Sequence, residues 1–134
     1  MLLVDASVWA ALERPGDRYH AEAGSIVLEL GAPLAALDLT LYEVANVAVR
    51  KFGQPARGVF LTRLILTLCG ENLLKADAEL IELAVEIAAE HGLTAYDAAY
   101  VAAARSQGWT LVSADIADLV SKGLAVAPDA ALYP

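Results

Sequence analysis

Short apolar runs of strand character alternate with longer helical segments along this chain, and no other feature of the sequence constrains the fold as strongly. The first run, residues 1–4, has no polar alternation, which is typical of a strand buried on both faces of a parallel sheet. We expect strands at residues 1–4, 33–37, 71–75, 110–112 and 124–127, and helices at 7–13, 17–30, 41–52, 55–68, 77–91 and 94–107. Parallel strands joined by helices need right-handed crossovers, so the sequence predicts an α/β fold. Its form is a single domain over residues 1–134, a three-layer α/β/α sandwich around a mostly parallel sheet of four or five strands.

Two of the expected helices carry an apolar face that should point into the core. In the helix at 17–30 this face holds Ile26, Val27 and Leu30. In the helix at 77–91 it holds Leu80, Ile81, Ala84, Ile87 and Ala88, whereas glutamates at positions 79, 82, 86 and 90 should form a solvated face.

The helices at 41–52 and 55–68 form a predicted hairpin that projects from the sheet-centred domain. The second of these helices is apolar over more than one stripe, with Val59, Phe60, Leu61, Leu64, Ile65, Leu66 and Leu68. A helix so broadly apolar is either deeply buried or shared with a second chain. We favour a shared surface, because a projecting hairpin leaves apolar side chains uncovered.

Composition bears on the cellular location of the protein and on the ligands it can bind. No stretch reaches the roughly 18 uninterrupted apolar residues of a membrane span, and Asp5 interrupts the only apolar start that could serve as a signal peptide. The single cysteine, Cys69, has apolar neighbours and should be a small buried side chain. We therefore expect a cytoplasmic protein with no membrane association. The net charge of −8 argues against binding a polyanion by bulk electrostatics, unless carboxylates gather at a cation site that inverts the local field.

Four acids stand at expected strand ends or helix starts. Asp5 follows the first strand, Glu43 and Asp97 open helices, and Asp115 follows the strand at 110–112. Each also has a structural interpretation as a helix cap, since Thr40 and Thr94 precede Glu43 and Asp97 by three residues in a capping-box pattern. In open α/β sheets, functional groups collect at the carboxyl ends of the strands.

Taken together, the four acids predict a metal site. Carboxylates that converge at one edge of a sheet repel one another unless a cation or raised pKa values relieve the charge. Oxygen ligands without histidine or cysteine select a hard ion, Mg²⁺ or Mn²⁺. Such a site supports hydrolysis of a phosphodiester by metal-activated water.

The residues around these acids, in this order, resemble the PIN-domain ribonucleases and in particular the VapC toxins of toxin–antitoxin pairs. The similar segments are Leu3-Val4-Asp5-Ala6-Ser7, Tyr42-Glu43-Val44-Ala45-Asn46, Leu93-Thr94-Ala95-Tyr96-Asp97-Ala98-Ala99-Tyr100 and Leu111-Val112-Ser113-Ala114-Asp115. The resemblance implies a PIN-like fold, Mg²⁺-dependent endonucleolytic cleavage of RNA, homodimerisation and inhibition by a cognate antitoxin protein. We expect that antitoxin to lie on the hairpin helices and to place a basic side chain among the acids.

The resemblance also implies roles for individual residues. Asp5, Glu43, Asp97 and Asp115 correspond to the family's catalytic and metal-binding acids. Ser7 matches a hydroxyl residue that could hydrogen-bond Asp5 or a metal-bound water, and Ser113 matches a hydroxyl before the last acid.

Helical spacing adds substrate or partner contacts along one face of the helix at 41–52. Glu43, Asn46, Val47 and Arg50 share a stripe that runs away from the metal site. We expect Arg50, with Lys51 beside it, to contact either a substrate phosphate or an acidic stretch of the inhibitor; the structural alternative is a solvated arginine favoured by the helix dipole.

A non-catalytic function competes with the ribonuclease interpretation. An acidic, dimeric binding module of the same fold could hold a partner protein through its apolar hairpin, residues 61–68. The two hypotheses differ in whether the carboxylates are needed for the effect in cells.

Overall fold

Four parallel strands form the central sheet of the computed structural model, which describes residues 1–134. They are β1 (Leu2–Val4), β2 (Leu34–Leu37), β3 (Leu73–Leu74) and β4 (Thr110–Val112), in the spatial order β3-β2-β1-β4. Leu2 is in register with both Leu34 and Thr110, so β1 has a neighbour on each side. Leu3 and Val4 are fully buried, as the apolar run predicts.

Eleven helical segments surround the sheet. The α-helices are α1 (Ala6–Leu12), α2 (His20–Gly24), α3 (Asp38–Asn46), α4 (Pro55–Cys69), α5 (Ala78–His91), α6 (Ala95–Gln107) and α7 (Pro128–Leu132). Three π-helical turns, η1 (Ser25–Glu29), η2 (Val47–Lys51) and η4 (Ile116–Val120), and one 3₁₀ turn, η3 (Gly70–Asn72), complete the chain.

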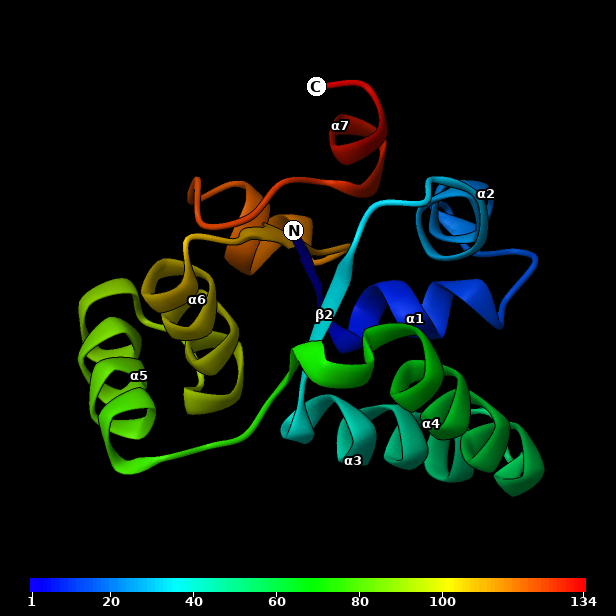
Figure 1. Cartoon of the computed structure of the whole chain (residues 1–134), viewed down its shortest axis with the longest axis horizontal. Coiled ribbons are helices and arrows are strands. Elements are labelled where there is room, and N and C mark those ends of the chain that lie inside the picture. The colour runs from blue at the N-terminus through cyan, green and yellow to red at the C-terminus, as the bar shows by residue number, and fades with distance from the viewer.

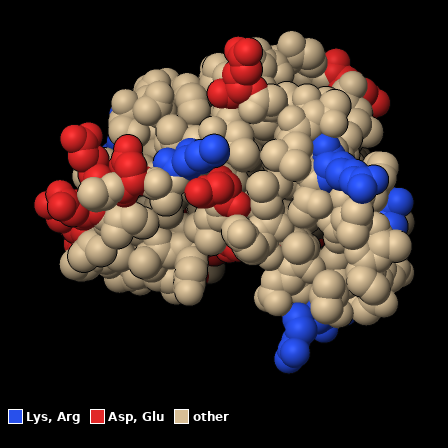
Figure 2. Space-filling model, turned by 60° about the horizontal axis from the view of Figure 1, so that its bottom comes forward, with Lys and Arg blue, Asp and Glu red and all other residues tan.

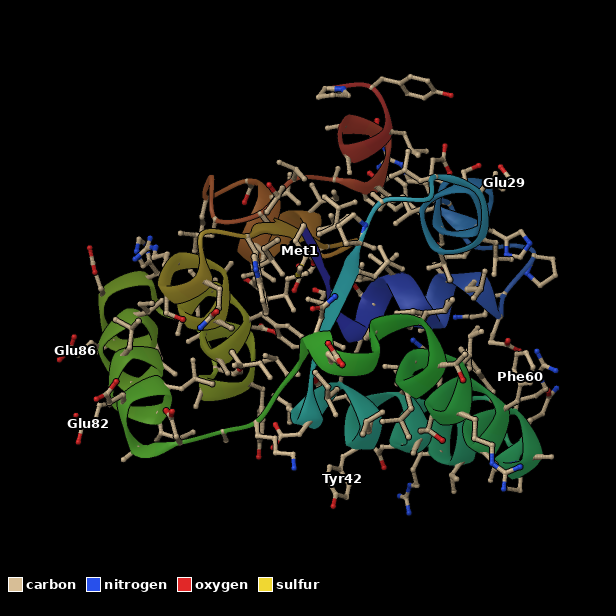
Figure 3. All side chains as sticks on the ribbon, viewed as in Figure 1. Met1, Glu29, Tyr42, Phe60, Glu82 and Glu86 are labelled. Atoms are coloured by element: carbon tan, nitrogen blue, oxygen red, sulfur yellow. The ribbon has the colours of Figure 1, made fainter.

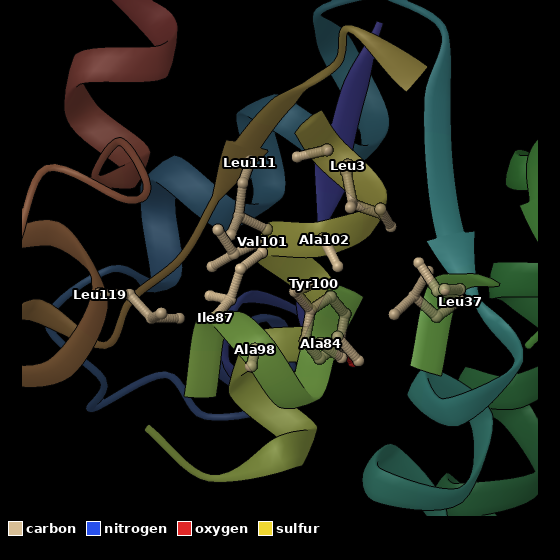
Figure 4. Close-up of a cluster of buried hydrophobic side chains, with 14 of the residues drawn as sticks. Leu3, Leu37, Ala84, Ile87, Ala98, Tyr100, Val101, Ala102, Leu111 and Leu119 are labelled. Carbon is tan, nitrogen blue, oxygen red and sulfur yellow. The ribbon is translucent and has the colours of Figure 1, made fainter. Parts of the chain in front are cut away.

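The strands separate two hydrophobic clusters, one on each face of the sheet. Successive strand residues point to opposite faces, so Leu3 packs with α5 and α6, whereas Val4 packs with α1 and α4. Figure 1 shows α5 and α6 on one side of the strands and α1 to α4 on the other. Figure 4 shows the first cluster, where Tyr100 and the small residues Ala98 and Ala102 of α6 lie among leucines of the strands. The predicted three-layer sandwich is confirmed.

The prediction of a fifth strand at residues 124–127 is wrong. Residues 124–127 run beside β4 but form a single bridge, between Val126 and Val112, so the sheet has four strands. The short helix α7, which begins at Pro128, ends this segment.

Two predicted core residues are exposed. Leu30 is 41% exposed, because it follows the π-helical turn η1, whose wider winding moves it off the face that holds Ile26 and Val27. Ile81 is 50% exposed and lines an apolar groove with Tyr42 and Tyr96, whereas its neighbour Leu80 points into the core. The glutamates of α5 are solvated as predicted, and Figure 3 shows Glu82 and Glu86 pointing away from the molecule.

The hairpin consists of α3 with η2, followed by α4. Pro55 occupies the first turn of α4, and one stripe with Leu61, Ile65 and Cys69 is buried. Cys69 is therefore the small buried side chain that the sequence predicts. Gly58 lies where a Cβ would approach the Cβ of Ala48 to 3.1 Å, so a glycine lets α4 pack closely on η2. The rest of α4 exposes Val59, Phe60, Leu66 and Leu68. None of the helices is both long and apolar enough to cross a membrane.

Candidate active site

The carboxyl ends of the parallel strands bring all four predicted acids to one edge of the sheet. Asp5 follows β1 directly, Glu43 lies in α3 just after β2, and Asp115 follows β4 after a two-residue turn. Asp97 lies in the first turn of α6. Parallel strands end at the same edge. The charge of Asp97 raises the pKa of Glu43, and that of Asp115 raises the pKa of Asp97, so these three acids lie within electrostatic reach of one another.

Asp5 is buried and held by a network of hydroxyl groups. Its Oδ1 accepts the backbone N–H of Ser7 at 3.0 Å and also the Ser7 hydroxyl. The Ser7 Oγ in turn accepts the N–H of Ala114 at 2.9 Å, and the Ser113 Oγ accepts the N–H of Asp115 at 3.0 Å. These bonds join the end of β1 to the loop after β4. Asp5 is therefore both the N-cap of α1 and the centre of this network.

The balance of burial and hydrogen bonding sets the charge of Asp5. Its side chain is 5% exposed, and burial raises its pKa from 3.8 to about 6, although hydrogen bonds from Ser113, Ser7 and Val8 oppose the rise. The buried carboxylate therefore forms at neutral pH at a free-energy cost, which a nearby cation would offset.

Glu43 is oriented by a chain of hydroxyl groups. The Thr40 Oγ1 accepts the N–H of Leu37 at 3.1 Å and lies 2.9 Å from the Tyr100 hydroxyl, which donates to the Glu43 Oε1 at 2.7 Å. Each hydroxyl has one proton, so Thr40 donates to Tyr100 and Tyr100 donates to Glu43. Burial, followed by the negative charges of Glu43 and Asp5, raises the pKa of Tyr100 well above its usual value, so it remains a donor.

This geometry corrects the capping interpretation of Glu43. The helix α3 begins at Asp38, three residues earlier than the predicted start, so Thr40 lies inside its first turn. Thr40 accepts from Leu37 rather than capping toward Glu43. The Glu43 carboxylate is consequently available to the site; burial, then the charge of Asp97, raises its pKa, and the bond from Tyr100 lowers it.

Asp97 and Asp115 converge with a third acid, Asp118. One carboxylate oxygen from each of the three lies within 4.8 Å of the others. Burial raises the pKa of Asp97, and the charges of Asp115 and Asp118 raise it further. The capping contacts are also present: Thr94 caps α6 by accepting the N–H of Asp97, and Asp115 accepts the N–H of Asp118. The capping interpretation is therefore confirmed at Asp97 and Asp115, and the metal-binding role of their carboxylates stays a prediction.

The donor set at this edge fits a hard divalent cation. All its ligand atoms are carboxylate oxygens, the donors that Mg²⁺ and Mn²⁺ prefer. The raised pKa values of Asp5, Glu43 and Asp97 show that the free carboxylates are crowded and desolvated. A bound cation relieves both effects.

Two of the acids, Glu43 and Asp115, line a cleft of about 720 Å³ between α1, α3 with η2, and the loop after β4, whereas Asp5, Asp97 and Asp118 are absent from its lining. The remaining predicted contact residues meet this cleft unequally. Ser7 and Asn46 line it, Ser113 is fully buried behind it, and Arg50 is absent from its lining, where Lys51 is present instead. In η2 the hydrogen bonds join residues five apart, so this turn is wound more widely than an α-helix. The helical face that begins at Glu43 therefore passes through Lys51 instead of Arg50.

Sequence reasoning missed Asp118 and Tyr100. Asp118 follows Asp115 by three residues, and that spacing could have suggested a shared site. Tyr100 ends one of the segments that resemble the family, but in an alanine-rich helix its pattern indicates only a core aromatic residue.

Comparison with known proteins gives consistent matches over most of the chain. The PIN domain family matches residues 2–118. Ribonuclease VapC3 of Pyrobaculum aerophilum is 36% identical over 121 residues, which cover 85% of this chain and 88% of that protein.

Solved structures share the fold. VapC20 of Mycobacterium tuberculosis, described as a toxin that cleaves the sarcin-ricin loop, superposes with a TM-score of 0.78 at 24% identity, over 94% of this chain and 97% of that one. A chain of a toxin–antitoxin complex from Klebsiella pneumoniae superposes with a TM-score of 0.71 at 24% identity, over 96% of this chain and 98% of that one.

Proposed function

Because the chain belongs to the PIN domain family of nucleases, we propose that it is a divalent-metal-dependent endoribonuclease that acts as the toxin of a toxin–antitoxin pair. The observation that carries this proposal is the convergence of acids from four separate segments at one edge of the sheet, with Asp97, Asp115 and Asp118 close enough to share an ion. The substrate is RNA, as the name of the relative VapC3 indicates for that protein.

Mg²⁺ is the proposed cofactor, with Mn²⁺ as a substitute. Asp97, Asp115 and Asp118 would bind the ion, and the carboxylates of Asp5 and Glu43 would add negative charge near it. When bound, the ion supplies a water activated for attack on phosphorus and stabilises the charge of the leaving oxygen.

The protein's own groups position these carboxylates. Ser7 and Ser113 fix the rotamer of Asp5 by hydrogen bonds, and Tyr100 fixes that of Glu43. The Ser7 hydroxyl donates to Asp5 and accepts from Ala114, so it joins Asp5 to the loop after β4. We expect hydrolysis by metal-activated water without a covalent intermediate.

The exposed apolar side chains of α4 support a protein partner. Val59, Phe60, Leu66 and Leu68 lie outside the core on the hairpin, and Figure 3 shows Phe60 at the outer end of α4. We propose that this surface serves the cognate antitoxin and the homodimer. The toxin–antitoxin complex among the structural neighbours supports an antitoxin partner.

Growth of cells that express the protein without an antitoxin tests this function against the non-catalytic binding module. We expect growth arrest by the wild type and by Asp129→Asn, which changes an exposed acid on α7, and no arrest by Asp97→Asn at equal protein level. Arrest that persists in Asp97→Asn would contradict a catalytic toxin. A binding module would instead lose its effect when Leu66 is changed to lysine and keep it in Asp97→Asn.

A further inference from the structure

Three cations without acidic partners line the cleft that leads away from the acids. The chain has 9 lysines and arginines and 17 acids, so there are enough acids for every cation to form an ion pair. Yet eight of the nine form no ion pair, and three of these eight, Arg14, Arg18 and Lys51, line the same cleft. The only arginine that is paired is Arg57, with Glu13. Unpaired cations gathered in one cleft of an acidic protein indicate a site for an anion that the protein does not itself supply.

Two of these cations lie beyond the acids along neighbouring helices. Asp5 is the N-cap of α1, and Arg14 lies two residues after the end of this helix. Glu43 lies in α3, and Lys51 is the last residue of η2, which continues α3. The helices α1 and α3 contact each other. The cleft therefore has an acidic end, at Glu43, and a basic end, at Arg14 and Lys51.

The winding of η2 selects the cation that faces the cleft. Regular α-helical spacing would place Arg50 beside Asn46 and Val47, but the π-helical turn from Val47 to Lys51 places Lys51 there. Tight packing of Gly58 on Ala48 holds this turn against α4.

Aromatic rings contact Arg14 and Arg18, the two arginines that line the cleft. The guanidinium of Arg14 lies 5.2 Å from the centre of the Phe52 ring, and that of Arg18 lies 5.0 Å from the centre of the Tyr19 ring. Stacking of this kind fixes the plane of a guanidinium and leaves its N–H groups free for phosphate oxygens. The one carboxylate at this end, Asp17, accepts the N–H of Tyr19 at 2.9 Å and pairs with neither arginine.

From these observations we infer that Arg14, Arg18 and Lys51 bind backbone phosphates of the RNA strand on one side of the scissile bond. This inference rests on the proposed ribonuclease function and adds a polarity to it. Figure 2 shows a group of acidic side chains at the α5 end of one face, whereas the basic side chains are spread over the rest of that face, with further acidic side chains at its upper edge. The cations that line the cleft all lie on one side of Glu43, so we expect nucleotides on that side of the cut to contribute most to binding.

Binding of RNA to a protein that cannot cut it tests the inference separately from catalysis. The parent is Asp97→Asn, and the probe is a short fluorescein-labelled single-stranded RNA of mixed sequence, followed by anisotropy over a series of salt concentrations. Into this parent go Arg14→Gln, Arg18→Gln and Lys51→Gln, one at a time, with Arg105→Gln, an exposed arginine of α6, as the matched control. None of these cations makes an ion pair, so the fold should not change.

We expect each of the three cleft variants to weaken binding several-fold and to lower the slope of log K against log salt by about 0.7, the value for one phosphate contact on a single strand. Arg105→Gln should change neither quantity. The inference is overturned if the parent does not bind the probe, if the three variants bind like the control, or if Arg50→Gln has a larger effect than Lys51→Gln. If wild-type protein cuts no RNA although the variants weaken binding as expected, the nuclease function fails and the phosphate site stands.

Discussion

The raised pKa of Asp5 predicts that replacing this acid stabilises the metal-free protein while abolishing its activity. Burial raises the pKa of Asp5 from 3.8 to about 6. Between these two pH values the unfolded chain loses the Asp5 proton and the folded protein keeps it, so the free energy of unfolding falls as the pH rises. A shift of this size corresponds to at most about 3 kcal/mol above the folded-state pKa.

The substitution Asp5→Asn removes this cost and keeps the hydrogen bonds from Ser7. An asparagine Oδ1 can accept from the backbone and hydroxyl of Ser7, and asparagine is as good an N-cap as aspartate. In EDTA at pH 7.5 we expect the variant to be more stable than the wild type by up to about 3 kcal/mol, or roughly 10 °C in Tm. Near pH 3.5 the two proteins should be equally stable, because Asp5 is then protonated in both the folded and the unfolded wild type.

Urea unfolding followed by tryptophan fluorescence at both pH values measures this difference. Saturating Mg²⁺ should stabilise both proteins, since a ligand that binds only the folded state adds its binding free energy, and it should stabilise the wild type more, because Asp5 adds negative charge near the ion. A variant that is less stable than the wild type at pH 7.5 in EDTA, or a difference that is the same at pH 3.5, would refute the reasoning.

Three further predictions follow from the contacts of the site and the hairpin. Tyr100→Phe removes the hydrogen bond that lowers the pKa of Glu43, so the acidic limb of the pH profile of RNA cleavage should move to higher pH, and an unmoved limb would exclude this role. Asp118→Asn should weaken Mn²⁺ binding about 10-fold in calorimetry, whereas Asp129→Asn should leave the affinity unchanged. Equal affinities in the two variants would show that Asp118 does not bind the metal. Leu66→Lys places a charge on an exposed apolar position of α4. It should weaken self-association or antitoxin binding in analytical ultracentrifugation, and the free energy of unfolding should stay within about 0.5 kcal/mol of the wild-type value. Unchanged assembly would show that the partner binds another surface.

The order of elements was predictable because each one depends on local patterns. The apolar run at residues 1–4 is typical of a strand covered on both faces, and Gly92 and Gly108 end α5 and α6 with positive φ angles as helix-terminating glycines do. Residues 124–127 have the same apolar character as a strand, yet they make one bridge, because strand pairing depends on a neighbouring edge that the local sequence does not describe.

The candidate site was predictable where it depends on strand ends and not where it depends on helix winding or tertiary contact. Asp5 and Asp115 could be placed because the residue after a parallel strand has a defined edge. The exchange of Arg50 for Lys51 in the cleft comes from the π-helical turn η2, which a period of 3.6 residues does not reveal. The contact of Tyr100 with Glu43 joins residues 57 positions apart in the sequence, and neither one indicates the other.

Incubation of the purified, antitoxin-free protein with total cellular RNA, in Mg²⁺, in Mn²⁺ and in EDTA, tests the central claim most directly. The wild type and Asp129→Asn should cut RNA internally in either metal and not in EDTA, and Asp97→Asn should not cut in any condition. Cutting that survives EDTA or the loss of Asp97 would contradict a metal-dependent site at this edge of the sheet, and a folded protein that binds Mn²⁺ but cuts no RNA would contradict the nuclease function.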